Sequence, residues 1–121
     1  MGTKTILIIE DEPQQVDMIT IRLEANGFKV IHAADGAEGL QKAYDTMPDL
    51  VILDIVMPKL DGFQVCSRLK GDDKTKKIPI IILTASGKKD LEEKCVGCGA
   101  EVILRKPYDS KQLVDTVKSF V

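Results

Sequence analysis

The chain has 121 residues, which is enough for one hydrophobic core and too few for two separate domains. Apolar residues make up 44% and charged residues 30% of the sequence, and the formal net charge is −2. This composition is typical of a soluble globular protein and argues against a nucleic-acid-binding or anionic-membrane surface. No apolar run approaches the roughly 18 residues that a membrane-spanning helix needs. The N-terminus lacks a secretory cleavage site, so a cytoplasmic location is expected.

The N-terminal part of the chain predicts a strand, a helix and a second strand. Residues 5–9 form a wholly apolar run, which is typical of a buried strand. Pro13 suits the first turn of a following helix, and Gly27 suits its C-terminal end. The buried face of this helix is expected to comprise Val16, Ile19 and Leu23. Residues 28–33 alternate in polarity like a half-buried strand.

The middle of the chain repeats this order. Asp35 and Glu38 resemble a capping box at the start of a second helix. Its expected apolar stripe comprises Leu40, Ala43 and Tyr44. Residues 50–54 are apolar up to a final carboxylate and predict a third strand, whereas residues 78–85 predict a fourth. The face of the helix between these two strands is marked by Phe63, Cys66 and Leu69.

The C-terminal part predicts two further helices on either side of one strand. Residues 87–97 are strongly charged and form the predicted fourth helix. Residues 101–107 predict the fifth strand, which Pro107 ends because proline has no backbone N–H for a strand ladder. Asp109 and Gln112 suit the start of a last helix, whose inward residues are expected to be Leu113, Val117 and Phe120.

Five strands, each followed by a helix, predict an α/β protein. Strands that are apolar throughout need cover on both faces, so the expected architecture is a parallel sheet between two layers of helices. Right-handed crossover connections make this arrangement doubly wound. We expect one domain that spans residues 1–121.

Polar side chains lie at the ends of four predicted strands. Glu10 and Asp11 follow the first strand, Asp54 ends the third, Thr84 lies near the end of the fourth and Lys106 near the end of the fifth. Ligand sites of such sheets lie outside the carboxyl ends of the strands, so these side chains are expected to converge. Clustered carboxylates repel one another and favour a bound cation. The residues therefore predict a cation site beside a hydroxyl and an ammonium group.

This ordered set of motifs resembles the receiver domain of two-component response regulators. The resemblance covers the whole chain, through the stretches IIEDE, LDIVMPKLDGF, ILTA and LRKP. It implies a flavodoxin-like fold with strand order 2-1-3-4-5 and five helices, the order that also occurs in a chemotaxis member of the family. It also implies a signalling domain that receives a phosphoryl group from a histidine kinase or a histidine phosphotransfer protein. Such a domain catalyses only its own phosphorylation and dephosphorylation, so it is not expected to be an enzyme with a separate substrate.

The resemblance assigns roles to the acidic residues. Asp54 would be the phosphoacceptor, because an aspartate carboxylate can act as a nucleophile and form an aspartyl phosphate. Asp11 would bind Mg²⁺ directly, and Glu10 would act mostly through water. Asp54 and the backbone carbonyl of Val56 would complete the metal ligands.

The resemblance also implies a phosphoryl-binding pair and a switch. Thr84 and Lys106 would bind oxygens of the phosphoryl group, and the peptide bond between Lys106 and Pro107 would be cis. Family members often pair the threonine with an aromatic residue three positions before the lysine, where this chain has Ile103. A switch through Thr84 and Ile103 would therefore be built differently here. It would alter a surface of the fourth helix, fifth strand and fifth helix, to which an unknown downstream protein or attached output domain would bind.

Two other functions stay open from the residues alone. A Mg²⁺-dependent phosphohydrolase with an aspartate nucleophile usually carries a second aspartate two residues later, where this chain has Val56. A flavodoxin-like nucleotide-binding protein would need a phosphate loop rich in Gly, Ser or Thr after the first strand. The sequence there is EDEPQQ, whose carboxylates would repel phosphates. Both departures favour the signalling domain.

The chain has three cysteines, and such a small, odd number argues against a secreted disulfide framework. Cys66 lies on an apolar helix face and is expected in the core. Cys95 and Cys98 have the spacing of a redox dithiol, but they lie near the end of a predicted helix rather than at its N-terminus, where the helix dipole lowers a thiol pKa. We expect packing residues, with a redox-sensing role as the alternative. His32 is expected to be a strand-end residue.

Overall fold

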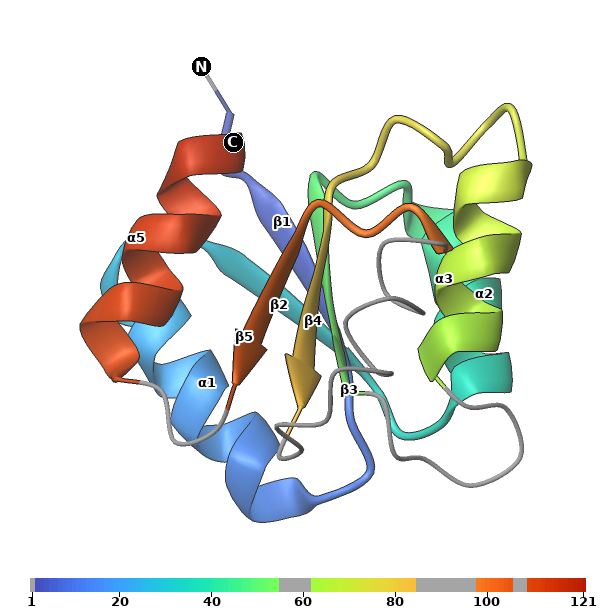
Figure 1. The fold of residues 1–121 in the computed structure, drawn as a ribbon. Helices are drawn as coiled ribbons and strands as arrows, with labels where there is room; N and C mark the ends of the chain where they lie inside the picture. The colour runs from blue at the N-terminus through green and yellow to red at the C-terminus, as the bar shows by residue number, and fades with distance from the viewer. Residues whose placement is uncertain (1, 55–61, 85–97, 106–108) are drawn as a thin grey trace.

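The computed structural model describes residues 2–54, 62–84, 98–105 and 109–121. Five strands form one parallel sheet in the order β2-β1-β3-β4-β5, and their carboxyl ends all point to the same edge (Figure 1). This order confirms the expected flavodoxin-like topology. The strands are β1 (Thr5–Ile9), β2 (Lys29–Ala33), β3 (Leu50–Asp54), β4 (Ile80–Thr84) and β5 (Val102–Arg105).

The described helices cover both faces of the sheet. On one face lie α1 (Pro13–Ala25) and α5 (Ser110–Phe120), and on the other lie α2 (Gly36–Thr46) and α3 (Gly62–Gly71) (Figure 1). This arrangement confirms the doubly wound fold. The helix predicted over residues 87–97 falls outside the described residues. No helix in the described part of the chain combines the length and apolar character that a membrane crossing requires.

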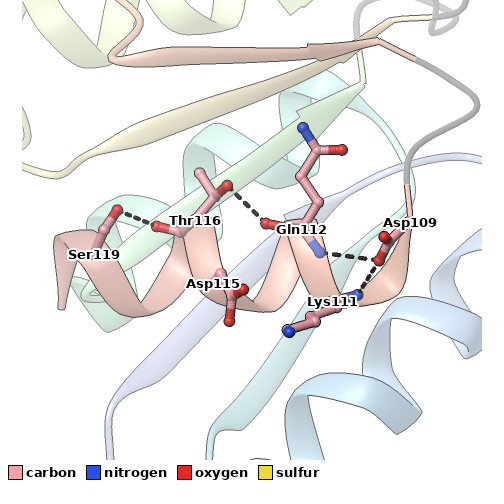
Figure 2. A pocket seen from close by; sticks show the side chains of 6 residues that line it. All are labelled: Asp109, Lys111, Gln112, Asp115, Thr116 and Ser119. Atoms are coloured by element: carbon pink, nitrogen blue, oxygen red, sulfur yellow. Dashed lines mark hydrogen bonds between the residues drawn. The ribbon is translucent and has the colours of Figure 1, made fainter.

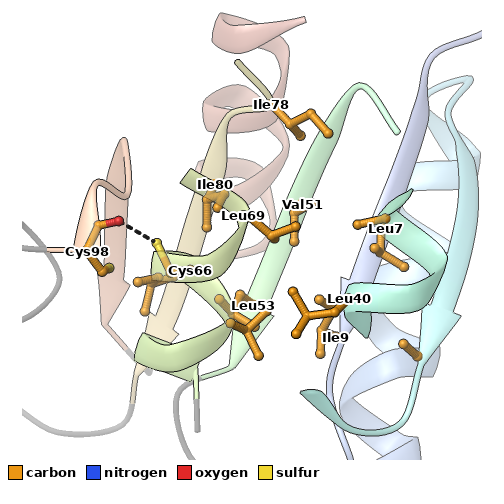
Figure 3. Close-up of a cluster of buried hydrophobic side chains, with 14 residues drawn as sticks. Leu7, Ile9, Leu40, Val51, Leu53, Cys66, Leu69, Ile78, Ile80 and Cys98 are labelled. Carbon is orange, nitrogen blue, oxygen red and sulfur yellow. Dashed lines mark hydrogen bonds between the residues drawn. The ribbon is translucent and has the colours of Figure 1, made fainter. Parts of the chain in front are cut away.

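The core is divided by the sheet into two clusters of buried side chains. Successive strand residues point to opposite faces, so Leu7 and Ile9 of β1 face α2 and α3, whereas Ile6 and Ile8 face α1 and α5. All four side chains are fully buried, which explains why the sequence of β1 is apolar throughout. The cluster shown in Figure 3, called here the α2–α3 core, comprises Leu7, Ile9, Ala33, Leu40, Ala43, Val51, Leu53, Val65, Cys66, Leu69, Ile78, Ile80, Ile82 and Cys98.

The helix ends follow the signals in the sequence. The Asp35 side chain accepts a hydrogen bond of 2.9 Å from the backbone N–H of Glu38 and so caps α2. Gly27 adopts a positive φ of 87° just after α1, as expected for a C-terminal glycine. The apolar stripe of α2 is confirmed for Leu40 and Ala43, which are buried. Tyr44 is 37% exposed and lies at the margin of that stripe, so its expected inward position is wrong.

Candidate functional site

Three carboxylates meet at the carboxyl edge of the sheet. Glu10 and Asp11 directly follow β1, and Asp54 is the last residue of the adjacent strand β3. One ligand oxygen from each carboxylate lies within 4.8 Å of the others. Glu10 is only 2% and Asp54 8% exposed, whereas Asp11 is exposed to solvent. The structure therefore brings together the three acids that the sequence predicted at this edge.

The pairing of β1 with β3 explains this convergence. The strands are in register from Ile6 opposite Leu50 to Ile9 opposite Leu53, so the next positions along them are Glu10 and Asp54. The helix α1 begins at Pro13, which leaves a short turn to carry Asp11 and Glu12 over the strand end. The paired residues of both strands are fully buried, and a slip by one residue would move every side chain to the opposite face of the sheet and disrupt the packing of both core clusters.

The donor set fits a hard divalent cation. Every ligand atom that Glu10, Asp11 and Asp54 contribute is a carboxylate oxygen, the type that Mg²⁺ prefers in proteins. Two of these carboxylates are nearly buried, so their mutual repulsion is weakly screened by water. A bound dication would relieve that repulsion. Asp11, unlike the other two carboxylates, is exposed to solvent.

The backbone brings a fourth predicted residue to the same edge. Thr84 is the last residue of β4, one position beyond Leu83, which pairs with Asp54. Thr84 in turn pairs with Arg105 at the end of β5. The expected roles of Val56, Lys106 and Pro107, including the cis peptide bond, fall on residues outside those that the structure describes.

Ile103 lies beside Ile82 in the register of β4 and β5. Its side chain is half-buried and packs against the α2–α3 core. An aliphatic side chain in this position fills part of the space that an aromatic ring would occupy, so the expectation of a differently built switch remains a prediction.

One contact at the site has no counterpart in the sequence patterns. The His32 ring lies with Nε2 2.9 Å from the backbone carbonyl oxygen of Glu10. The expectation of a strand-end residue is correct for its place near the end of β2, but it gives no hint of this contact. The two residues are 22 positions apart, so only the pairing of β1 with β2 reveals it.

The cysteines that the structure describes are packed in the interior. Cys66 is fully buried on α3, as expected, and Cys98 is 6% exposed (Figure 3). The Cys66 thiol donates a hydrogen bond of 3.4 Å to the backbone carbonyl of Cys98. Burial, with a further contribution from hydrogen bonding to the Cys98 side chain, raises the pKa of the Cys66 thiol far above its ordinary value. A thiol held in its protonated form is a poor nucleophile, which favours packing for Cys66. Cys95 falls outside the described residues.

The raised pKa of Cys66 predicts a loss of stability at alkaline pH. The stabilisation is complete below the ordinary thiol pKa of about 8.5. Above that pH the unfolded chain releases a proton that the folded chain retains, so the free energy of unfolding falls by up to about 1.4 kcal/mol per pH unit. Urea unfolding between neutral pH and about pH 10 should show this slope in the wild type and a smaller slope in Cys66→Ala. Equal slopes in the two proteins would contradict the prediction.

A second polar region lies on the outer side of α5. A hollow there is lined by Asp109, Lys111, Gln112, Asp115, Thr116 and Ser119 (Figure 2). Some of its polar groups are engaged within the helix: Asp109 accepts from the backbone N–H groups of Lys111 and Gln112, and the Thr116 hydroxyl donates to the carbonyl of Gln112 at 2.7 Å. These bonds are typical of a helix start and its solvated face. The hollow contains none of the acids at the sheet edge.

Replacing Asp11 with asparagine tests the electrostatics of the three acids. In metal-free buffer, Asp11→Asn should raise the free energy of unfolding by about 0.5–1 kcal/mol, because one of three mutually repelling charges is lost. Excess Mg²⁺ should stabilise the wild type and have little effect on the variant, because a ligand that binds only the folded state stabilises it. Urea unfolding with chelator and with Mg²⁺ measures both effects.

Asp17→Asn, the same change on the exposed side of α1, is the matched control and should respond to Mg²⁺ like the wild type. An equal Mg²⁺ response in Asp11→Asn would contradict the prediction.

Comparison with known proteins agrees with this geometry. The family model of the response regulator receiver domain matches residues 6–118. Over 118 residues the chain is 41% identical to the DNA-binding dual master transcriptional regulator RpaA of Synechocystis sp.. The match covers 96% of this chain and 48% of RpaA, so the chain spans about half the length of that relative.

Solved structures give the same relationship. The chemotaxis protein CheY4 of Vibrio cholerae is 28% identical, with a TM-score of 0.93, and the match covers 99% of this chain and 100% of that one. The receiver domain of the sensor histidine kinase PA1611 from Pseudomonas aeruginosa PAO1, solved with a magnesium ion coordinated in the active site cleft, is 27% identical. Its TM-score is 0.90, and the match covers 98% of each chain. The chain belongs to the response regulator receiver domain family.

Proposed function

We propose that this chain accepts a phosphoryl group on Asp54 in a Mg²⁺-dependent reaction and transmits a signal through the resulting change in its surface. The observation that carries the proposal is the convergence of three carboxylates, from two adjacent strands, within 4.8 Å of one another at the carboxyl edge of the sheet. Receiver domains are the signalling domains of two-component systems, so the phosphoryl donor is proposed to be a histidine kinase or a histidine phosphotransfer protein.

The proposed metal ligands are Asp11, Asp54 and the backbone carbonyl of Val56, with Glu10 acting mostly through water. Mg²⁺ would supply charge neutralisation for the incoming phosphoryl oxygens and would keep water ligands that such an oxygen can displace. The magnesium ion in the PA1611 receiver domain, which has the same fold, supports this assignment.

In the proposed reaction, a carboxylate oxygen of Asp54 attacks the phosphorus of a phosphohistidine. An O–P bond forms as the N–P bond breaks, and the leaving imidazole nitrogen takes a proton from solvent. Asp54 is only 8% exposed and ends a rigid central strand, so its carboxylate has a restricted set of orientations. The carboxylates of Glu10 and Asp11 lie beside that of Asp54 and would face the bound cation.

Thr84 and Lys106 are proposed to bind the phosphoryl oxygens of the aspartyl phosphate. The backbone register supports this role for Thr84, because β4 ends one residue beyond the partner of Asp54. Lys106 directly follows Arg105, which pairs with Thr84. A hydroxyl donor and an ammonium group at these positions would compensate the charge of the phosphoryl oxygens.

The output of the proposed switch is a change in partner binding rather than turnover of a metabolite. The surface of the predicted fourth helix with β5 and α5 is the proposed site, and a separate protein or an attached domain is the proposed partner. Ile103, packed against the α2–α3 core, is the proposed link between Thr84 and this surface. RpaA is about twice as long as this chain, and its name describes it as a DNA-binding transcriptional regulator.

Intact-mass spectrometry after incubation with acetyl phosphate tests the proposal. One phosphoryl adduct per chain should appear in the presence of Mg²⁺ and should be absent when a chelator removes it. Sustained release of inorganic phosphate from small phosphomonoesters, without an adduct, would instead indicate the aspartate-nucleophile phosphohydrolase. Wild-type protein that binds Mg²⁺ but forms no adduct, with acetyl phosphate or with a phosphorylated phosphotransfer protein, would overturn the proposed function.

A further inference from the structure

The strand ladder that carries the acidic pair ends at Glu10. In the pairing of β1 with β2, Ile9 lies opposite Ala33, and the backbone N–H of Glu10 donates to the carbonyl of Ala33 at 3.0 Å. In a continued parallel ladder, the Glu10 carbonyl would accept from the backbone N–H two residues beyond Ala33. That residue is Asp35, which leaves the sheet as the N-cap of α2 with φ −147° and ψ 173°.

The His32 side chain supplies a donor to the Glu10 carbonyl. Its Nε2 atom lies 2.9 Å from that oxygen. A carbonyl oxygen can only accept a hydrogen bond, so Nε2 carries the proton and donates it. The contact is part-buried and therefore protected from competition with water. The carbonyl belongs to the peptide group that joins Glu10 to Asp11, so the ring restrains the plane of that peptide.

His32 is itself held in place by α2. Its backbone carbonyl accepts a hydrogen bond of 2.5 Å from Lys42 Nζ. Lys42 also forms an ion pair of 3.0 Å with Glu38, in the first turn of α2. The hydrogen bond from Lys42 lowers the pKa of the Glu38 carboxyl and so favours its charged form. His32 is thus restrained by its strand and by α2, which makes it a suitable support for a neighbouring peptide.

We propose that His32 is a positioning residue for the acidic pair. By donating to the Glu10 carbonyl, it fixes the peptide between Glu10 and Asp11 so that both carboxylates converge with Asp54. The inference rests on the proposed function, because convergence matters for binding Mg²⁺. Groups that orient metal ligands through hydrogen bonds typically affect affinity strongly, and an effect through one backbone carbonyl should be smaller.

Calorimetric titration of the unphosphorylated protein with Mg²⁺ tests the proposal without relying on activity. His32→Leu, which keeps bulk and removes the donor, should weaken Mg²⁺ binding by about threefold to tenfold. His32→Gln, whose amide N–H can reach the same carbonyl, should retain most of the affinity. If His32→Leu does not fold, His32→Asn replaces it, because its shorter amide stops short of the Glu10 carbonyl.

Val30→Ala is the matched control for a general loosening of β2. Val30 is half-buried on the same strand and face as His32, and it packs against the cluster on the α1 and α5 side. This variant should lower the urea midpoint and leave the Mg²⁺ affinity unchanged. Wild-type affinity in His32→Leu, or equal losses in His32→Leu and His32→Gln, would overturn the positioning role. Absence of Mg²⁺ binding in the wild type would instead overturn the proposed function.

Discussion

Asp54→Asn should form no phosphoryl adduct under conditions in which the wild type is phosphorylated. The amide of asparagine is a far weaker nucleophile than a carboxylate, and it carries no charge for a cation to neutralise. Asp54 is the last residue of β3, whereas Glu10 and Asp11 lie just beyond the last residue of β1. We therefore expect complete loss of the adduct rather than transfer to a neighbouring acid.

The same variant should fold, which makes the loss of the adduct interpretable. Asparagine has nearly the shape of aspartate, and the change removes one of three crowded charges from a position that is only 8% exposed. In metal-free buffer the free energy of unfolding should therefore rise by about 1 kcal/mol. Intact-mass spectrometry and urea unfolding of one preparation would measure both effects.

Asp17→Asn on the exposed side of α1 is the control for Asp54→Asn and should be phosphorylated like the wild type. An adduct on Asp54→Asn equal to that of the wild type would show that another residue is the acceptor. The acidic cluster would then bind a metal ion without accepting a phosphoryl group. Peptide mapping of the adduct would locate the true acceptor.

The sequence predicted most of the fold because its signals are local. Alternation between apolar runs and helical stripes identified the described elements, and Asp35 and Gly27 marked helix ends through their own side chain and backbone. The prediction for Tyr44 was wrong because helical spacing does not tell how wide the buried face of α2 is. The strand order came from the resemblance, since apolar strands of similar length can pair in several orders.

The acids were predictable for a physical reason that does not extend to His32. Glu10, Asp11 and Asp54 directly follow or end apolar runs, and parallel strands bring their carboxyl ends to one edge. His32 reaches the site through a hydrogen bond to a backbone carbonyl, which depends on the register of β1 and β2 and on where β2 leaves the sheet. Backbone acceptors have no signature in sequence, so supports of this kind are found only in a structure.

The close packing of α2 on β1 predicts a large effect at Gly39. A Cβ atom at this position would lie 2.5 Å from Cδ1, 2.8 Å from Cγ1 and 3.0 Å from Cγ2 of Ile9. Ile9 is fully buried between its neighbours Ala33 and Leu53, so it has little room to move. Gly39→Ala should therefore lower the free energy of unfolding by about 1–3 kcal/mol, as overpacking of a core does. The cost of overpacking should exceed the gain of about 1 kcal/mol in the free energy of unfolding that replacing glycine by alanine normally brings in a helix.

Gly71→Ala provides the matched control, because it makes the same chemical change in the last residue of α3, where a Cβ would meet nothing within 4 Å. It should leave the free energy of unfolding unchanged or raise it by up to about 1 kcal/mol. Urea unfolding followed by circular dichroism would compare both variants with the wild type.

The effect of Gly39→Ala should also reach the acidic cluster, because Ile9 directly precedes Glu10 and the displaced strand end carries the acid pair. The stabilisation by Mg²⁺ should therefore be smaller in Gly39→Ala than in Gly71→Ala, which leaves β1 untouched. If the two alanine variants were equally stable, Ile9 would have to adopt another rotamer at little cost. The α2–α3 core would then be looser than its buried side chains imply, and the packing of α2 would not help to hold Glu10 and Asp11 in place.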